Sequence, residues 1–422
     1  MNRFATDSIA RPRRPLSRVL RRGAMTMAIV ATLATLTATS VTGSASSVAS
    51  SPASVTVLAS GEGWQLADYH CGHATCVRIE HASNVKGAWV REAVPPALQT
   101  LMRTSASDYY PNAQFSIYFT NAEDGWIYGS AQNGGPATTF DAALWSTHDA
   151  GHTWSPVPVQ SLGMRTAILS VSASHGQVYA LGWNTDQTFG LWRSAISTDA
   201  WHRVQTPTLP PAAGGGSMQG AFVFKGHAGW LMVGNDRGVT GAARLTSSGH
   251  WVTWAGPCAR VGGTFAVPVA YSSTTLVDDC TIGGFGGDVA RTTPKSLKMN
   301  TSWLFTSHDG GLDFTPTREV SVGIRTMWLV QVPGLPASPA PGVILVEKPI
   351  NKGQTSPEHL FATNNGGRTW RSVYTPSQPT ATIQLITFAS PRLGVAIVQV
   401  DASTSYLVIS TDGGRTWRRS AT

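Results

Sequence analysis

The chain has 422 residues, of which 42% are hydrophobic and only 13% are charged. Its 43 glycines and 15 tryptophans suit a fold with many short turns around a large buried area. The net charge is +8, but residues 1–50 alone hold seven arginines and one acid, so the remainder carries only about +2. Nucleic acid would need a basic surface on the folded part, and we therefore expect no nucleic-acid partner.

Residues 1–45 are predicted to be a secretory signal or an N-terminal membrane anchor. Seven arginines, the last of them Arg22, precede an uncharged stretch from Gly23 to about Val41, and small residues follow it. This layout is typical of a bacterial secretory signal, and the general route fits better than the twin-arginine route. The stretch reaches about the length of a short membrane span, so an uncleaved anchor is the alternative. We expect a protein that is secreted or held in the cell envelope and meets a membrane only through this segment.

Residues 46–54 are predicted to be a linker, and residues 55–422 to form one domain. Within this domain, short apolar or alternating runs lie between Gly, Asn and Asp turns, which predicts β-strands and no long helix. One unit is expected to place strands at 115–120, 126–130, 141–148 and 153–159, and the last unit at 383–388, 393–400, 406–411 and 417–421. Each unit therefore has four antiparallel strands.

The four cysteines form two pairs, which in an exported protein favours disulfides. Cys71 ends one predicted strand and Cys76 begins the next, so a bridge between them would close a hairpin. Cys258 and Cys280 lie in consecutive units, so their bridge would tie two neighbours together. The alternative is a metal site at residues 70–76, because histidine and thiolate suit zinc or copper. Its spacing matches no standard ligand pattern, and we expect no bound metal.

A segment of the form Ser/Thr-x-Asp-x-Gly-x-Thr-Trp recurs along the domain. We call its four clearest copies the box turns: residues 147–154, 307–314, 363–370 and 410–417. Worn copies at 82–89, 197–201 and 247–254 bring the units to seven, with their final aromatic residues 47–65 positions apart. This period suits the blades of a β-propeller with loops of variable length. The prediction is an all-β, seven-bladed propeller of four-stranded antiparallel blades.

The box turns have a structural explanation that needs no catalysis. Asp or Asn accepts hydrogen bonds from turn N–H groups, Gly adopts a positive φ, and an aromatic residue packs as the chain re-enters a strand. These roles are assigned to the acceptors Asp149, Asp309, Asn365 and Asp412, the glycines Gly151, Gly311, Gly367 and Gly414, and the aromatics Trp154, Trp370 and Trp417. We therefore assign no catalytic, cofactor-binding or metal-binding residue.

The box turns resemble the Asp-box, or BNR repeat, of sialidase-like β-propellers. The resemblance covers essentially all of residues 55–422 and extends to Ycf48-like proteins and exported bacterial proteins with WD40, YVTN or BNR-like repeats. It implies a propeller fold. Sialidases carry an arginine triad, a tyrosine activated by glutamate, an acid/base aspartate and a hallmark aromatic-Arg-Ile-Pro string. The nearest string, Val-Arg-Ile-Glu at 77–80, lacks the aromatic residue and the proline. A glycoside hydrolase with a divergent active site is therefore the alternative.

The favoured function is a non-enzymatic interaction platform, a monomer without a cofactor whose partner is a protein or a glycan. Loops carry function on rigid scaffolds, so inserted segments are the expected contact surfaces. These segments are residues 95–111, 281–301, 334–342 and 348–358. The last two are rich in proline and also fit a solvated linker.

Overall fold

The computed structural model of the chain separates Met1–Ser47 from a compact unit at Val48–Thr422. The structure describes residues 51–71, 74–104, 106–107, 110–111, 113–132, 140–184, 186, 188–210, 218–235, 238–261, 268–281, 302–320, 324–331, 343–349, 357–365, 367–401 and 403–420. The expected signal or anchor at 1–45 lies outside the described residues, so its assignment stays a prediction. None of the helices that the structure describes is long and apolar enough to cross a membrane.

Within the described residues, the strands form seven four-stranded antiparallel sheets, each built from consecutive strands of the chain. Sheet 1 contains β1 (Ser51–Val57), β2 (Gly63–Cys71), β3 (Ala74–Ala82) and β4 (Val90–Glu92). Sheet 2 contains β7 (Ala113–Phe119), β8 (Gly125–Gln132), β9 (Phe140–Thr147) and β10 (Ser155–Pro156). Sheet 3 contains β11 (Ala167–Ser174), β12 (Gln177–Trp183), β13 (Phe189–Ala195) and β14 (His202–Val204). Sheet 4 contains β15 (Met218–Lys225), β16 (Ala228–Asn235), β17 (Gly238–Leu245) and β18 (Trp251–Thr253).

The second half of the chain continues the same pattern. Sheet 5 contains β19 (Val269–Ala270), β20 (Leu276–Thr281), β21 (Ser302–Ser307) and β22 (Thr315–Val320). Sheet 6 contains β23 (Ile324–Gln331), β24 (Val343–Pro349), β25 (His359–Thr363) and β26 (Arg371–Tyr374). Sheet 7 contains β27 (Thr382–Phe388), β28 (Gly394–Gln399), β29 (Ser405–Ser410) and β30 (Arg418–Arg419). A two-stranded ribbon, β5 (Ala106–Ser107) with β6 (Tyr110–Pro111), lies between sheets 1 and 2 in the sequence.

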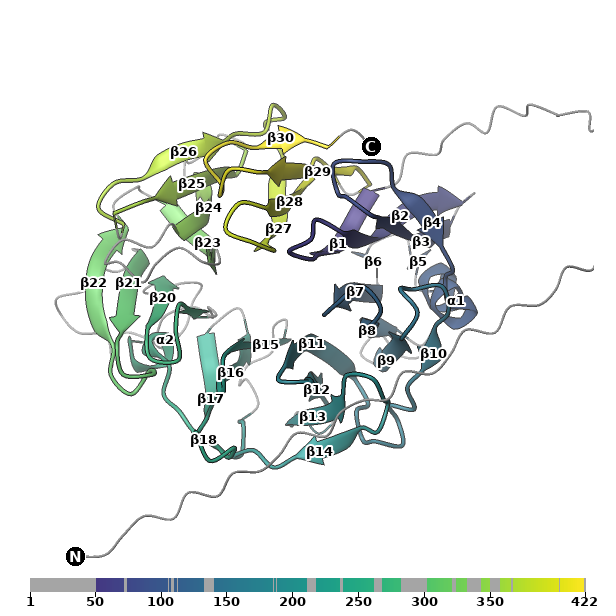
Figure 1. Ribbon diagram of the computed structural model, residues 1–422, viewed down its shortest axis with the longest axis horizontal. Helices are drawn as coiled ribbons and strands as arrows, with labels where there is room; N and C mark the ends of the chain where they lie inside the picture. The colour runs from purple at the N-terminus through teal and green to yellow at the C-terminus, as the bar shows by residue number, and fades with distance from the viewer. Residues whose placement is uncertain are drawn as a thin grey trace, which may run out of the picture. The chain divides into compact units, whose positions relative to one another are not determined.

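The sheets follow one another around a ring, so the fold is a β-propeller with four-stranded antiparallel blades, as predicted (Figure 1). The innermost strand β1 packs beside β7 of sheet 2 and β28 of sheet 7. Six sheets have described side chains in all four strands, whereas those of β23 and β24 in sheet 6 lie outside the described set. Six blades are therefore described with side chains in all four strands, rather than the seven expected. Sheet 6 is described in β23 and β24 by the pairing of their backbones alone.

The hydrophobic core lies between neighbouring sheets. Side chains alternate between the two faces of each strand, so each sheet buries both faces against its neighbours. Between sheets 1 and 2, Trp64 and Leu66 of β2 pack against Phe119 of β7. The rings of Trp64 and Phe119 stack with their centroids 4.0 Å apart. Because one sheet cannot bury both faces alone, the stability of each blade depends on the next.

Two short helices that were not expected from the sequence interrupt the strands. α1 (Pro96–Thr104) follows sheet 1, and α2 (Pro257–Val261) follows sheet 4. Each begins with proline, whose fixed φ suits the first helical position. In α1, Leu98 and Met102 are buried in the core of sheets 1 and 2, four positions apart on one helix face. A pattern this short is hidden among strand patterns of similar length.

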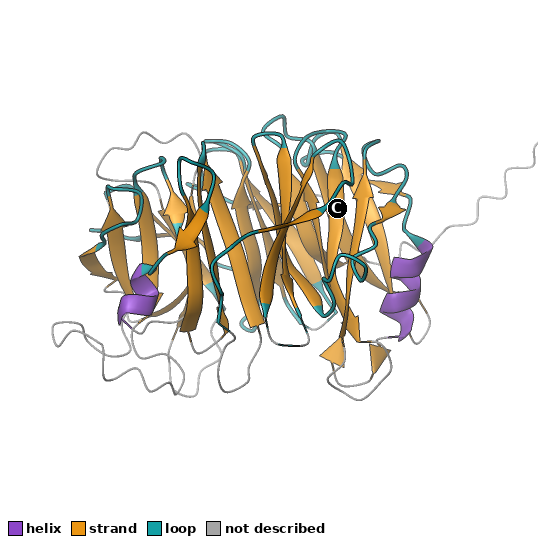
Figure 2. Cartoon of the chain, turned by 90° about the horizontal axis from the view of Figure 1, so that it is seen from below, coloured by secondary structure: helices purple, strands orange, loops and turns teal. Residues whose placement is uncertain are grey.

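The sheets have two distinct edges. At the first, the box edge, the turn between the first two strands of a sheet lies beside its box turn. There the N–H of Ala150 donates to Glu123 O, and the N–H of Gly413 donates to Arg392 O, both at 3.0 Å. The opposite edge, the loop edge, holds the connections between second and third strands and from one sheet to the next, including both helices (Figure 2).

Three of the four inserted segments attach at the loop edge. Residues 95–111 connect sheets 1 and 2, residues 281–301 connect β20 to β21, and residues 348–358 connect β24 to β25. Residues 334–342 connect β23 to β24 at the box edge instead. Residues 105, 108–109, 282–301, 334–342 and 350–356 lie outside the described residues, so for these parts the structure shows only where the segments attach.

Candidate functional site

The four box turns share one hydrogen-bond pattern. In the turn at 410–417, the Ser410 hydroxyl donates to Asp412 Oδ1 at 2.9 Å and accepts from Gly414 N at 2.8 Å. Asp412 Oδ1 also accepts from Thr416 N at 3.0 Å. The same three contacts recur at 2.8–3.0 Å in the turns at 147–154, 307–314 and 363–370. Asn365 takes the place of the carboxylate in the third of these.

The glycine of each box turn lies in the left-handed region. The φ angles are +95° at Gly151, +87° at Gly311, +77° at Gly367 and +81° at Gly414. At Gly367 an added Cβ would also come within 2.8 Å of Leu304 Cδ1, the flexible end of a side chain that can shift, so the positive φ is what requires glycine. The aromatic residue that ends each turn packs inward: Trp417 is buried, and Trp154 and Trp370 are half-buried.

The box carboxylates are ionised and already bound within the turn. At Asp309, the N–H of Asp313 and then the Ser307 hydroxyl lower the pKa of the carboxyl, against a smaller opposing effect of burial. At Asp412, burial raises the pKa, but the hydrogen bonds from Thr416 and Ser410 together outweigh it and lower the pKa below 3.8. Such a carboxylate has no proton to give near neutral pH, so it makes a poor general acid.

A second contact joins the box turns to the preceding sheet. Trp64 Nε1 in sheet 1 donates to Ala150 O in the box turn of sheet 2 at 2.9 Å. Trp230 Nε1 in sheet 4 likewise donates to Gly310 O in the box turn of sheet 5 at 3.0 Å. Both tryptophans follow a glycine near the start of a second strand. This Gly-Trp pair marks the strand start in the sequence, but nothing there shows that the indole reaches the next sheet.

Trp126, a third tryptophan in a Gly-Trp pair, lacks this contact. It is wholly buried, and its Nε1 has no hydrogen-bond acceptor among the described residues. The next sheet carries the truncated copy at 197–201 in place of a full box turn. Sheet 3 has no full box turn whose carbonyl could accept a hydrogen bond from Trp126 Nε1, as the box turns of sheets 2 and 5 do for Trp64 and Trp230.

The box turn of sheet 2 carries two histidines that contact different neighbours. His148 Nδ1 lies 2.6 Å from Asp124 Oδ1, and its Nε2 lies 3.5 Å from Asp199 Oδ2, beyond the third strand of sheet 3. Partial burial lowers the pKa of His148, but the hydrogen bond to Asp124 and the charge of Asp199 outweigh burial, so the pKa is raised overall. The Ser146 hydroxyl holds Asp199 Oδ2 at 2.7 Å. A protonated His148 therefore ties sheet 2 to sheet 3.

The second histidine of this turn contacts sheet 1. His152 Nδ1 lies 2.9 Å from Glu92 Oε2, and Glu92 Oε1 lies 3.6 Å from His81 Nδ1. His81 Nε2 in turn contacts Glu62 Oε1 at 2.9 Å. Acids and imidazoles thus alternate along a row that crosses from sheet 1 to sheet 2 at the box edge. The row therefore joins the two sheets through side-chain contacts.

Both predicted disulfides are present. Cys71 and Cys76 bridge β2 and β3 with their Cα atoms 5.8 Å apart. Cys258 of α2 and Cys280 of β20 are bonded with their Cα atoms 5.1 Å apart. Because α2 packs against β17 of sheet 4 as well as β20 of sheet 5, this bridge strengthens the junction of two sheets. The alternative metal site at 70–76 has no thiolate pair, because its two cysteines are bonded to each other.

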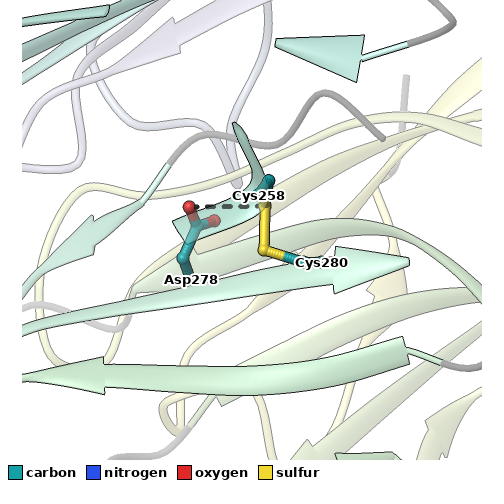
Figure 3. A group of neighbouring side chains, drawn as sticks. All are labelled: Cys258, Asp278 and Cys280. Carbon is teal, nitrogen blue, oxygen red and sulfur yellow. Dashed lines mark hydrogen bonds between the residues drawn. A yellow bond between two sulfur atoms is a disulfide. The ribbon is translucent and has the colours of Figure 1, made fainter. Parts of the chain in front are cut away.

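A wholly buried carboxyl lies against the second disulfide (Figure 3). Asp278 Oδ2 is 3.6 Å from Cys258 Sγ, and Asp278 Oδ1 accepts from Asp279 N at 2.9 Å. Burial, and then the charge of Asp279, raises the pKa of Asp278 well above 3.8 despite that hydrogen bond. Within the described part of the chain, Cys258, Asp278 and Cys280 are the one group whose ligand atoms lie close enough together to hold a metal ion. The closed disulfide offers no thiolate, which keeps this group from binding one.

One further carboxyl has a raised pKa. Burial alone brings the pKa of Asp68 in β2 to about 6. A carboxyl that titrates near neutral pH is able to act as a general acid. Glycoside hydrolysis also needs a second carboxyl about 5–9.5 Å away. Among the described residues, no charge contributes to the pKa of Asp68, so none of them is identified as this second carboxyl.

No protein-family model matches the sequence, and no curated protein matches it. Solved structures do match. YCF48 bound to D1 peptide has a TM-score of 0.53 at 12% identity, covering 87% of this chain and 94% of that chain. A PL25 ulvan lyase bound to a GlcA-Rha3S ligand has a TM-score of 0.52 at 10% identity, covering 86% of this chain and 92% of that chain. The BP39L lectin from Burkholderia pseudomallei has a TM-score of 0.51 at 11% identity, covering 87% of this chain and 98% of that chain. At these identities the likeness, including the expected likeness to Ycf48, is one of propeller fold.

Proposed function

We propose that residues 48–422 form a binding platform that holds a protein or a glycan at the loop edge. The contrast between the two edges carries this proposal. At the box edge, the acids Asp149, Asp309 and Asp412 are hydrogen-bonded within their turns and have lowered pKa values. At the loop edge, three inserted segments join a rigid ring, and binding residues concentrate on loops that a rigid scaffold positions.

The similar folds support a binding role for such a ring. YCF48 is bound to a D1 peptide, and BP39L is a lectin. A shared fold does not transfer a ligand from one protein to another. It does support the use of this scaffold to hold a peptide or a sugar, and those are the two classes of partner that we propose here.

We further propose that the ring has seven blades, with sheet 6 as one of them, and that the box turns are Asp-boxes. The pairing of β23 with β24 and of β24 with β25 supports the blade count. The common hydrogen-bond pattern supports the second point, because Asn365 in sheet 6 repeats the contacts of the three aspartates. A crystal structure with a different number of blades would contradict this proposal.

We place the platform outside the cytoplasm, in the cell envelope or secreted, as a monomer without a cofactor or nucleic-acid partner. The two disulfides support this location, because disulfides persist in oxidising compartments. Residues 1–45 would then be the signal or the anchor. N-terminal sequencing of protein recovered from the cell envelope tests the assignment: a start near residue 46 supports a cleaved signal, and an intact N-terminus supports an anchor.

The alternative function is a glycoside hydrolase, and the pKa of Asp68 near 6 is the observation that favours it. Its test is an assay of the purified full chain against fluorogenic sialosides and neutral glycosides. We expect no turnover. Turnover that Asp68→Asn abolishes, while Asp412→Asn leaves it intact, would establish the enzyme and overturn the platform.

The platform is tested by exchanging one inserted segment at each edge for a short Gly-Ser linker. Replacement of residues 283–300 alters the loop edge, and replacement of residues 334–342 is the matched control at the box edge. Partner recovery from cell-envelope extracts should fall with the first replacement and stay unchanged with the second. Equal recovery by both variants would remove residues 283–300 from the proposed contact surface.

A further inference from the structure

We propose that Cys258, Cys280 and Asp278 bind a soft divalent cation, zinc above all, when the disulfide between the two cysteines is reduced. The three side chains converge from α2 and β20, and their ligand atoms lie within 4.8 Å of one another (Figure 3). Tetrahedral zinc, with Zn–S bonds of about 2.3 Å, holds two sulfurs about 3.8 Å apart. Small side-chain rotations provide this separation once the bond is open, because the Cα atoms are already 5.1 Å apart.

Asp278 is the residue that packing does not explain. Its side chain is 0% exposed, and an apolar residue would fill the same space without the cost of burying a carboxyl. Its Oδ2 lies 3.6 Å from Cys258 Sγ, a disulfide sulfur that has no hydrogen to donate. A cation bound between Asp278 and the two sulfurs would use this oxygen as a ligand.

Two chemical steps lead to the bound ion. A dithiol reductant first breaks the S–S bond, supplies two electrons and two protons to leave a thiol on each cysteine, and closes to its own disulfide. The cation then displaces three protons, one from each thiol and one from the Asp278 carboxyl, and binds through two sulfurs and one oxygen. The fourth tetrahedral position is left for a water molecule.

The donor set determines which cation is bound. Thiolates select zinc over calcium and magnesium, which prefer oxygen ligands.

The metal ion can reach the site only through a local opening of the fold, because all three side chains are buried. Cys258 comes from a helix of five residues, and local opening of so short an element would admit both the reductant and the ion. Either crosslink, the disulfide or the metal ion, ties α2 to β20.

The other disulfide offers a matched control within the same chain. Cys71 and Cys76 also lie on neighbouring strands, but no third ligand among the described residues joins them in a group that could hold a metal ion. The Cys71→Ser/Cys76→Ser variant should therefore retain the proposed site, and the Cys258→Ser/Cys280→Ser variant should lose it.

The test measures cobalt and zinc binding by the full chain after reduction with a phosphine that is then removed under inert gas. Reduced wild type should bind about one zinc ion at this site, and cobalt should show thiolate charge transfer with tetrahedral visible bands. Asp278→Asn should bind at least about 10-fold more weakly, because even residues that only contact a metal ligand change affinity by about that factor.

Asp278→Asn keeps both cysteines, so circular dichroism of its oxidised form checks that the variant folds. The proposal is overturned by a reduced wild type that shows no thiolate–cobalt absorption, or by a Cys71→Ser/Cys76→Ser variant that loses it. Equal affinity of Asp278→Asn and wild type also overturns it, as does an oxidised sample that binds as well as the reduced one.

Discussion

The side chain of Asp309 shows what one box residue contributes. Its Oδ1 accepts hydrogen bonds from Ser307 Oγ, Leu312 N and Asp313 N at 2.8–3.0 Å. Asp309→Ala should lower the free energy of unfolding by about 1–2 kcal/mol, as for loss of a helix-capping side chain. Asp309→Asn keeps the acceptor, as Asn365 does in sheet 6, so it should cost clearly less. Urea unfolding compares the two variants, and equal losses would contradict the acceptor role.

His148 should make stability depend on pH in the opposite sense to the box carboxylates. The folded state raises its pKa above the usual value of 6.5, so its contribution is fully present below pH 6.5 and is lost as the pH rises through the folded value. Melting temperatures between about pH 5 and 8 should fall more steeply with rising pH in wild type than in His148→Gln.

His308→Gln is the control for this measurement. His308 fills the same position in the box turn of sheet 5 but forms no ion pair in the part of the chain that the structure describes. Its replacement should therefore leave the slope of wild type unchanged. A His148→Gln profile parallel to that of wild type would show that the contacts to Asp124 and Asp199 carry no net stability.

At the scale of the element, the Gly-Trp pairs connect one sheet to the box turn of the next. Trp64→Phe removes the hydrogen bond to Ala150 O as well as ring area, whereas Trp126→Phe removes ring area and an N–H without an acceptor among the described residues. The first substitution should therefore cost about 1 kcal/mol more than the second. Denaturant unfolding measures both, and the reverse order would contradict the proposed tie between sheets.

The two disulfides should differ in their contribution to stability. Cys258 and Cys280 are separated by 22 positions, and Cys71 and Cys76 by 5. The entropy of the closed loop predicts a loss of about 3 kcal/mol for replacing the first pair with alanine and about 2 kcal/mol for the second. Guanidinium unfolding of the two double variants provides the comparison. A larger loss at the shorter loop would show that native contacts, not chain entropy, dominate.

The inner strands could be predicted from the sequence because turn residues and apolar alternation mark their ends. Strands expected at 383–388, 393–400 and 406–411 lie at Thr382–Phe388, Gly394–Gln399 and Ser405–Ser410. The outermost strand was harder, since it pairs on one side only and needs no buried pattern. A strand was expected at 417–421, and the observed strand β30 covers only Arg418–Arg419. Short edge strands of this kind limit pairing with other chains.

The site was predictable where it is local and unpredictable where it joins sheets. The box contacts lie within eight residues, but His148 and Asp199 meet only because the ring brings two sheets together. In a degenerate copy of the motif, the sequence does not determine at which residue the turn begins. In the copy at 247–254, Thr246 Oγ1 accepts from His250 N at 3.2 Å, so the pattern starts one residue earlier than its remaining Thr and Trp suggest.

At the scale of the whole molecule, the box edge stabilises the ring, and we propose that the loop edge binds the partner. The most direct test introduces a photo-reactive amino acid at exposed positions of each edge and illuminates living cells. Loop-edge positions are His70, Asp186 and Thr380, and box-edge positions are Leu312, Arg392 and Arg415. We expect a covalent adduct with one protein or glycan from the loop edge and none from the box edge. Adducts from the box edge alone, or equally from both edges, would contradict it.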